Sequence, residues 1–165
     1  MKLFSLVICL VTFFSCSSPV SEKSVDPDLL TLEIIQASKD FQTAYINNDF
    51  ATASTFLSDD ITSTIYNSNG SPLVIQSDEQ ISTSGAGWSF TRFDMSNHQV
   101  FIAPGATSIA VAFDTDGIVR FDKTGEEVPY STRASQFWVT TEEGWKIIHS
   151  HWSPKSAAKG IPDEN

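Results

Sequence analysis

Two histidines, His149 and His151, stand two residues apart near the C-terminal end of the chain. The segment around them has the alternation of a β-strand, in which residues i and i+2 point to the same face. A histidine that titrates near neutral pH can act as a general acid or base, and two of them could relay a proton or hold an anion. The spacing therefore indicates either a catalytic pair or two polar groups that the fold satisfies with hydrogen bonds.

A histidine pair on one strand face could also bind zinc, which would need a third protein ligand. His98 is the other histidine and stands in a different predicted strand, so a carboxylate such as Asp59 or Asp60 would have to complete the site. Those two acids follow a predicted helix and precede a strand, where we expect them to cap and turn the chain. The sequence predicts no metal site.

The strand that carries the histidines offers two alternative faces. Strict alternation places four residues on one face and four on the other: Trp145, Ile147, His149 and His151 against Lys146, Ile148, Ser150 and Trp152. Lysine resists burial. We therefore expect the histidine face to line the concave side of the sheet.

Other candidates for a binding site lie in the helix and strands that would surround such a concave side. Tyr45, Trp88, Trp138 and Trp145 could form an aromatic wall for a ring-bearing ligand, and we expect two of the four to touch the cavity. Arg133 could clamp a carboxylate or phosphate, or it could pair with a surface acid. The alternation around it leaves open whether Arg133 or Gln136, together with Trp138, faces inward.

The elements that must position these residues begin with a helix. Asp26-Pro27 provides a cap followed by proline at the first helical position, and apolar residues recur at spacings of three and four from Leu30 to Ala44. A second, short helix is predicted over residues 50–57, and a weaker one over residues 77–84, capped by Ser77. This start predicts a helical layer.

Strands account for most of the remaining chain. They are predicted over residues 61–66, 89–103, 107–113, 118–121, 130–140 and 145–152, with turns at 104–105, 114–117 and 142–144. Because helices precede a run of antiparallel strands without βαβ alternation, the sequence predicts an α+β domain in which a curved sheet closes over a helix layer.

The first residues have the layout of an export signal. Lys2 precedes an apolar run that ends at Phe14, which is too short to span a bilayer. Ser15-Cys16 resembles the lipobox of bacterial lipoproteins, which implies cleavage after residue 15 and acylation of Cys16. The alternative is a plain secreted protein. We expect a signal at 1–15, a lipidated cysteine and tether at 16–26, a domain at 27–153 and a disordered tail at 154–165.

Charge and cysteine content exclude several classes of protein. Removing residues 1–15 deletes Lys2 and no acid, which leaves nine basic against 20 acidic residues and a net charge of −11. Nucleic acid is therefore not an expected partner, because phosphate binding requires a basic surface. Cys9 lies in the signal, so Cys16 would be the only cysteine left and no disulfide can form within the mature chain.

Two regions resemble the nuclear transport factor two-like superfamily and its SnoaL-like group. The first holds Phe41, Tyr45, Asn48-Asp49-Phe50 and Phe56-Leu57-Ser58-Asp59-Asp60; the second holds Arg133, Phe137-Trp138 and the run from Gly144 to Ser153. The resemblance implies a cone-shaped, cystatin-like fold with N-terminal helices packed on a curved antiparallel sheet around a pocket. It also implies frequent dimerisation through the sheet.

These observations favour one function and leave two others open. We expect a lipid-anchored module of the cell envelope, in the periplasm or on the cell surface, that binds a small organic ligand without a cofactor and without catalysis. The first alternative is a cofactor-independent isomerase, dehydratase or hydrolase that uses His149 or His151 as acid or base. The second is a structural homodimer that buries Ile148 and Trp152 on the outer face of the sheet.

Overall fold

The computed structural model describes residues 26–83 and 87–155 of the chain. The predicted signal, the predicted acylation site at Cys16 and most of the predicted tether lie outside these residues, as does most of the predicted tail. No helix within the described ranges is both long and apolar enough to cross a membrane.

Helix α1 (Pro27–Ile46) is the long helix that the sequence predicts. The Asp26 side chain accepts a hydrogen bond from the backbone N–H of Asp28 at 2.9 Å and so caps the first turn. The helix ends where Asn48 takes a positive φ of 59°. Its buried face combines apolar and polar residues: Leu30, Ile34, Ser38, Phe41, Gln42 and Ala44.

Two short helices follow in the order predicted. Helix α2 (Phe50–Ser54) is capped by Asp49 and is shorter than the predicted 50–57, because the chain turns at residues 55–57. Helix α3 (Asp78–Thr83) matches the predicted 77–84, and the Ser77 hydroxyl accepts from the N–H of Gln80 at 3.2 Å.

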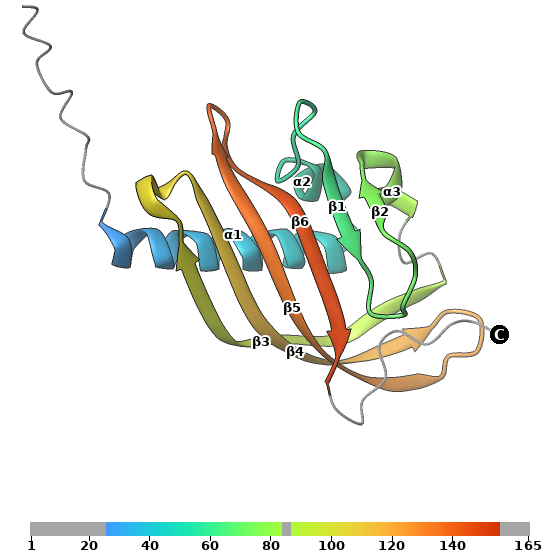
Figure 1. Ribbon diagram of the computed structural model, residues 1–165. Helices are drawn as coiled ribbons and strands as arrows, with labels where there is room; N and C mark the ends of the chain where they lie inside the picture. The colour runs from blue at the N-terminus through green and yellow to red at the C-terminus, as the bar shows by residue number, and fades with distance from the viewer. Residues whose placement is uncertain (1–25, 84–86, 156–165) are drawn as a thin grey trace, which may run out of the picture.

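The sheet has six strands in the order β2-β1-β6-β5-β4-β3 (Figure 1). Their bounds are β1 (Ser63–Tyr66), β2 (Val74–Gln76), β3 (Trp88–Ile102), β4 (Ser108–Phe121), β5 (Glu127–Thr141) and β6 (Gly144–Pro154). Neighbours pair antiparallel except β1 and β6, which are parallel. The sheet is therefore mixed rather than wholly antiparallel, and β2 is a strand that the sequence did not predict.

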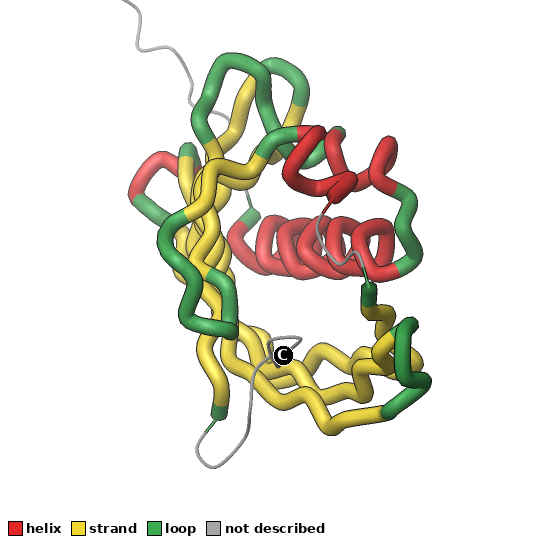
Figure 2. Tube along the Cα trace, turned by 90° about the vertical axis from the view of Figure 1, so that its right-hand side faces the viewer, coloured by secondary structure: helices red, strands yellow, loops and turns green. Residues whose placement is uncertain are grey.

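Helix α1 covers one face of the sheet, and the long strands bend around it (Figure 2). The core lies between them and includes Ile34, Ile109, Trp138 and Ile147, all at most 2 % exposed. Phe56 packs edge-on against Trp138 with ring centroids 6.0 Å apart. The fold is the predicted α+β arrangement of helices on a curved sheet.

Strand β4 is continuous where the sequence predicted a turn at 114–117. Asp114, Thr115 and Asp116 alternate outward, inward and outward in a regular ladder with β5. Gly117 does not form a turn; it allows two strands to lie close together. A Cβ on this residue would lie 2.4 Å from the carbonyl oxygen of Arg92, so glycine permits β3 to approach β4 closely at an irregularity between Phe90 and Arg92.

A second irregularity, in β6, reverses the predicted strand faces. Phe137 pairs with His149, but the next residue of β5, Trp138, pairs with Ile147, so Ile148 is an extra residue in β6. Ile147 therefore faces α1, and beyond the bulge Ser150 and Trp152 also face α1. His149 and His151 lie on the outer face, and the prediction that they line the concave side is wrong.

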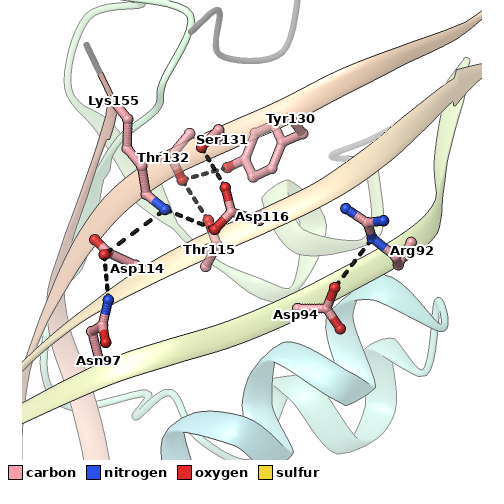
Figure 3. A network of polar contacts seen from close by, with 10 residues as sticks. All are labelled: Arg92, Asp94, Asn97, Asp114, Thr115, Asp116, Tyr130, Ser131, Thr132 and Lys155. Carbon is pink, nitrogen blue, oxygen red and sulfur yellow. Dashed lines mark hydrogen bonds and ion pairs between the residues drawn. The ribbon is translucent and has the colours of Figure 1, made fainter.

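Lys155, the residue after β6, is held to the outer face of β4. The Lys155 ammonium lies 2.8 Å from a carboxylate oxygen of Asp116 and 3.8 Å from one of Asp114 (Figure 3). Pro154 belongs to β6. The predicted disordered tail therefore begins too early, at least for these two residues.

Candidate binding cavity

A cavity of about 220 Å³ opens between the C-terminal half of α1 and the curved sheet. Fourteen residues line it, drawn from α1, β1 and its following turn, β2, α3 and the strands β3, β5 and β6: Phe41, Gln42, Tyr45, Ile65, Asn67, Ser68, Asn69, Gln76, Gln80, Trp88, Phe90, Phe93, Tyr130 and Trp152. Residues that are far apart in sequence therefore meet at one site.

One wall of the cavity is aromatic. The ring of Phe90 contacts those of Trp88, Phe93 and Tyr130 with centroids 5.3, 4.8 and 5.0 Å apart, all in edge-to-face geometry. Edge-to-face packing is a favoured arrangement of aromatic pairs. The irregularity in β3 that Gly117 permits falls between Phe90 and Arg92, so it brings Phe90 and Phe93 to the same face.

Six other lining residues carry neutral polar groups. Amides come from Gln42, Asn67, Asn69, Gln76 and Gln80, and a hydroxyl comes from Ser68. Gln42 is 4 % exposed on the buried face of α1, and the Gln76 amide oxygen accepts a hydrogen bond from the buried Ser63 hydroxyl at 3.1 Å. A site that combines clustered aromatic rings with amide groups suits a ring with polar substituents.

Tyr130 contributes both an aromatic ring and a polar group to the cavity. Its ring belongs to the aromatic wall, while its hydroxyl accepts a hydrogen bond from the Thr132 hydroxyl at 3.2 Å (Figure 3). Thr132 is in turn 2.6 Å from the Thr115 hydroxyl on the neighbouring strand. Burial raises the pKa of Tyr130 above its ordinary value, although the hydroxyls of Thr132, Ser68 and Thr115 act in the opposite direction.

The described lining holds no acid, base, thiol or ammonium group. Its only titratable side chains are the tyrosines, and Tyr130 stays protonated at neutral pH because its pKa is raised. The described residues also contain no group of three or more histidine, cysteine, aspartate or glutamate side chains placed to hold a metal ion.

The four aromatic residues that the sequence singled out divide evenly. Tyr45 and Trp88 line the cavity. Trp138 is fully buried in the core, and the Trp145 indole donates a hydrogen bond to Glu33 near the N-terminal end of α1, 3.1 Å away. Two of the four therefore touch the cavity, and Trp138 and Trp145 do not.

Gln136 and Arg133 lie on opposite faces of β5. Gln136 points inward and is fully buried, where its amide oxygen accepts from the Ser38 hydroxyl at 2.6 Å, but it does not line the cavity. Arg133 is exposed on the outer face. The structure thus settles the alternation that the sequence left open, and Arg133 cannot clamp a ligand inside this cavity.

The two histidines lie outside the cavity, beside aromatic residues of the outer face. His149 Nδ1 is 2.9 Å from the Thr64 hydroxyl, and the Tyr66 ring packs edge-on against both imidazoles at about 6 Å. Burial, followed by the neighbouring His151, lowers the pKa of His149. Neither histidine can transfer a proton to a molecule held in the cavity.

Sequence reasoning missed Gln42 and the aromatic residues around Tyr130. One signal was available. Ser38 and Gln42 fall on the apolar stripe of α1, because they follow Leu30 and Ile34 at intervals of four. Polar residues on a buried stripe indicate a hydrogen-bonding partner or a cavity behind the helix. The assembly of Phe90, Phe93 and Tyr130 carried no such signal, because it depends on strand register.

Known proteins resemble this chain in sequence pattern and in fold. A family model described as a SnoaL-like domain matches residues 34–157. No curated protein matches the chain in sequence. The match begins within α1 and includes every later element through β6, and so covers most of the chain.

Several solved structures share the fold. A nuclear transport factor 2 (NTF2-like) superfamily protein from Salmonella enterica serovar Typhimurium is 15 % identical, with a TM-score of 0.65 over 85 % of this chain and 100 % of that one. A ketosteroid isomerase-like protein from Erwinia carotovora atroseptica is 16 % identical, with a TM-score of 0.61 over 78 % and 97 %. The association domain of C. elegans CaMKII is 18 % identical, with a TM-score of 0.57 over 76 % and 96 %.

Proposed function

Because the chain belongs to the SnoaL-like domain family, whose fold encloses a pocket here, we propose that it is a binding module for one uncharged, ring-bearing small organic molecule. The observation that carries this proposal is the lining of the cavity. Half of its fourteen described residues are aromatic and six are amides or a serine hydroxyl, with no group that is charged at neutral pH.

The lining of the cavity disfavours a charged ligand. An ionised ligand that enters such a site loses its hydration without gaining a counter-charge, which is strongly unfavourable. The protein as a whole is also acidic, with a net charge of −10 over the full sequence, so it does not attract anions over distance. An uncharged ligand avoids both costs.

The size of the cavity restricts the ligand to about one ring. Drug-sized ligands occupy pockets of about 300–1,000 Å³, and benzene fits an apolar cavity of about 150 Å³. A cavity of about 220 Å³ therefore suits a single ring with one or two small substituents.

The same lining favours binding over catalysis. A general acid or base must lie within hydrogen-bonding reach of the reacting group and titrate near the working pH. The described lining offers no such group, because Tyr130 has a raised pKa and both C-terminal histidines lie on the outer face. A cofactor-independent enzyme that uses His149 or His151 at this cavity is therefore not part of the proposal.

A set of neutral and ionised single-ring compounds tests the binding proposal by protein-detected NMR titration. We expect neutral members to shift the resonances of cavity residues and ionised members of equal size to leave them unchanged. Ile65→Phe adds a ring to the cavity and should abolish binding, whereas Phe137→Ser, on the outer face, should not. Equal binding of ionised compounds, or unchanged binding to the Ile65 variant, would contradict the proposal.

The N-terminal residues support a place at the cell envelope. The proposed anchor, Cys16, precedes a tether of ten residues, 17–26, which spans at most about 33–36 Å when extended. The cavity would therefore stay within a short distance of the membrane that holds the lipid. Cys16→Ser should move the exported protein from the membrane fraction to the soluble fraction. A variant that still fractionates with the membrane would argue against acylation at this residue.

A second candidate function, self-association, is favoured by the outer face of the sheet. One row of paired residues crosses all six strands and contains no aspartate, glutamate, lysine or arginine. Its members are Phe101, Ala110, Phe137, His149, Thr64 and Ile75. Phe101, Phe137 and Ile75 are 58 %, 45 % and 64 % exposed. A row this long, with three exposed apolar side chains, suits contact with a second copy of the chain.

This row replaces the dimer surface that the sequence predicted. Trp152 packs against Phe113 in the core, with ring centroids 5.6 Å apart, and so cannot lie in an outer interface. Sedimentation analysis of wild type and Phe137→Lys tests the revised surface, with Leu32→Lys on exposed α1 as the control. We expect a dimer that only the Phe137 variant dissociates. A monomeric wild type at about 100 μM would refute self-association through this face, because interfaces of stable dimers bind more tightly than this.

A further inference from the structure

Three hydroxyl groups form a chain beneath the cavity. Thr115 on β4 and Thr132 on β5 are register partners, both fully buried, with their oxygens 2.6 Å apart. Thr132 then donates to the Tyr130 hydroxyl at 3.2 Å. Figure 3 shows dashed lines that join Thr115 to Thr132 and Thr132 to Tyr130, and Tyr130 is the only one of the three that lines the cavity.

The direction of this chain follows from counting protons. Each hydroxyl has one proton to donate. The proton of Thr132 goes to Tyr130, so the short contact between the two threonines must use the proton of Thr115. The order of donation is therefore Thr115 to Thr132 to Tyr130, and the proton of Tyr130 points away from the threonines.

The phenol oxygen of Tyr130 accepts the proton of Thr132, so the two threonines leave the Tyr130 proton for another partner. The hydroxyl of Ser68, in the turn after β1, also lowers the pKa of Tyr130. A ligand acceptor that takes the Tyr130 proton gives this buried hydroxyl a second hydrogen bond without disturbing the threonines.

We propose that the cavity ligand carries an uncharged hydrogen-bond acceptor of the carbonyl type, and that this oxygen accepts the proton of Tyr130. The inference rests on the proposed binding function and narrows its ligand class to ring compounds with a ketone, aldehyde, ester or amide oxygen. Thr132 is a positioning residue, because it orients the Tyr130 hydroxyl without lining the cavity. Cooperative hydroxyl chains in a buried setting strengthen the terminal donor.

Two probes of nearly equal shape test the acceptor. Acetophenone has a carbonyl oxygen where α-methylstyrene has a methylene group, and each carries one ring, as the cavity volume of about 220 Å³ requires. We expect the wild-type protein to bind acetophenone about tenfold more tightly in NMR titrations, since a hydrogen bond in a buried site contributes on this order. Tyr130→Phe should make the two dissociation constants equal.

Two further variants distinguish the loss of Tyr130 orientation from a general disturbance of the cavity. Thr132→Val should reduce the preference for acetophenone while leaving the affinity for α-methylstyrene unchanged, because it removes the donor that orients Tyr130. Ser131→Ala alters the adjacent residue, whose side chain bonds to Asp116 on the outer face, and should leave both affinities unchanged.

The outcomes distinguish this inference from the proposed function. If wild type binds both probes equally and Tyr130→Phe changes neither, the acceptor is refuted while the single-ring cavity stands. If neither probe shifts any cavity resonance at millimolar concentration, the proposed binding function fails as well.

Discussion

Replacing Gly117 by alanine tests the close approach of β3 and β4 that shapes the aromatic wall of the cavity. Gly117 lies within β4, opposite Phe93, and its backbone has no positive φ that would by itself require glycine. The expected effect is therefore steric. A Cβ at this position would lie 2.4 Å from the Arg92 carbonyl oxygen and 3.3 Å from its carbonyl carbon.

The magnitude follows from the displacement that alanine would force. Real Cβ atoms are not found closer than 3.0 Å to such an oxygen, so the two strands must separate by at least 0.6 Å. Overpacking of this kind costs about 1–3 kcal/mol. Alanine also reduces the conformational entropy of the unfolded chain, which stabilises the folded protein by about 0.4–1 kcal/mol. We expect a net loss of about 1–2 kcal/mol, or a Tm lower by about 3–8 °C for a domain of this size.

Thermal and guanidinium unfolding followed by circular dichroism measure this loss. Gly70→Ala is the control, because Gly70 has a φ of +78° and no atom within 4 Å of a Cβ built on it. Alanine at position 70 should lower the stability by about 1 kcal/mol, because it must adopt a left-handed backbone conformation. Gly70→Asn should lose less stability, because asparagine tolerates that conformation. No asparagine rescue is expected at Gly117. A Gly117→Ala protein as stable as wild type would refute the close contact between the strands.

Two other predictions concern a histidine and a buried lysine. His149 has a pKa held below 6.5 by burial and by His151, so the unfolded chain binds protons that the folded chain does not. The free energy of unfolding should therefore decline as the pH falls through about 6.5. His149→Gln should reduce this dependence of stability on pH, as measured by Tm between about pH 7.5 and about pH 5.5. A variant whose Tm depends on pH as strongly as that of wild type would contradict the lowered pKa of His149. Lys146, 6 % exposed, donates to the Thr55 carbonyl oxygen at 2.9 Å and lies 3.0 Å from Glu143, a residue whose side chain is 76 % exposed. Lys146→Met should lower the free energy of unfolding by about 1–3 kcal/mol in guanidinium denaturation, because the Thr55 carbonyl loses its partner. Glu143→Gln should change it by less than about 1 kcal/mol. Equal effects of the two variants would contradict this prediction, because they would show that the exposed ion pair contributes as much as the buried hydrogen bond.

Local features of the fold could be predicted because their causes are local. The Asp26-Pro27 cap and the apolar spacing from Leu30 to Ala44 predicted a helix that begins at Pro27, and α1 spans Pro27–Ile46. The short helix after Ser77 and the long strands β3, β5 and β6 were also expected within a few residues. In each case a capping side chain or an alternation of side chains acts within a few residues of the backbone that it controls.

Predictions that extended alternation over a whole strand were wrong wherever a bulge interrupts it. Ile148 shifts β6 by one residue and turns His149 and His151 from the predicted inner face to the outer one. The apolar residues hinted at this shift, since Trp145 and Ile147 share one alternate set and Trp152 belongs to the other. Asp114, Asp116 and Gly117 have the composition of a turn, yet pairing with β3 and β5 on both sides holds them in a continuous strand.

The sequence by itself determined the class of fold, the long helix, most of the strands and the acidic character of the protein, because these follow from composition and short-range patterns. Only the tertiary structure decided which residues share the cavity. Gln42, Ser68, Phe90 and Tyr130 come from four separate elements, and their meeting depends on strand register, on two bulges and on the bend of the sheet around α1. Register is fixed by contacts between distant segments, and a shift of one residue exchanges the two faces of a strand.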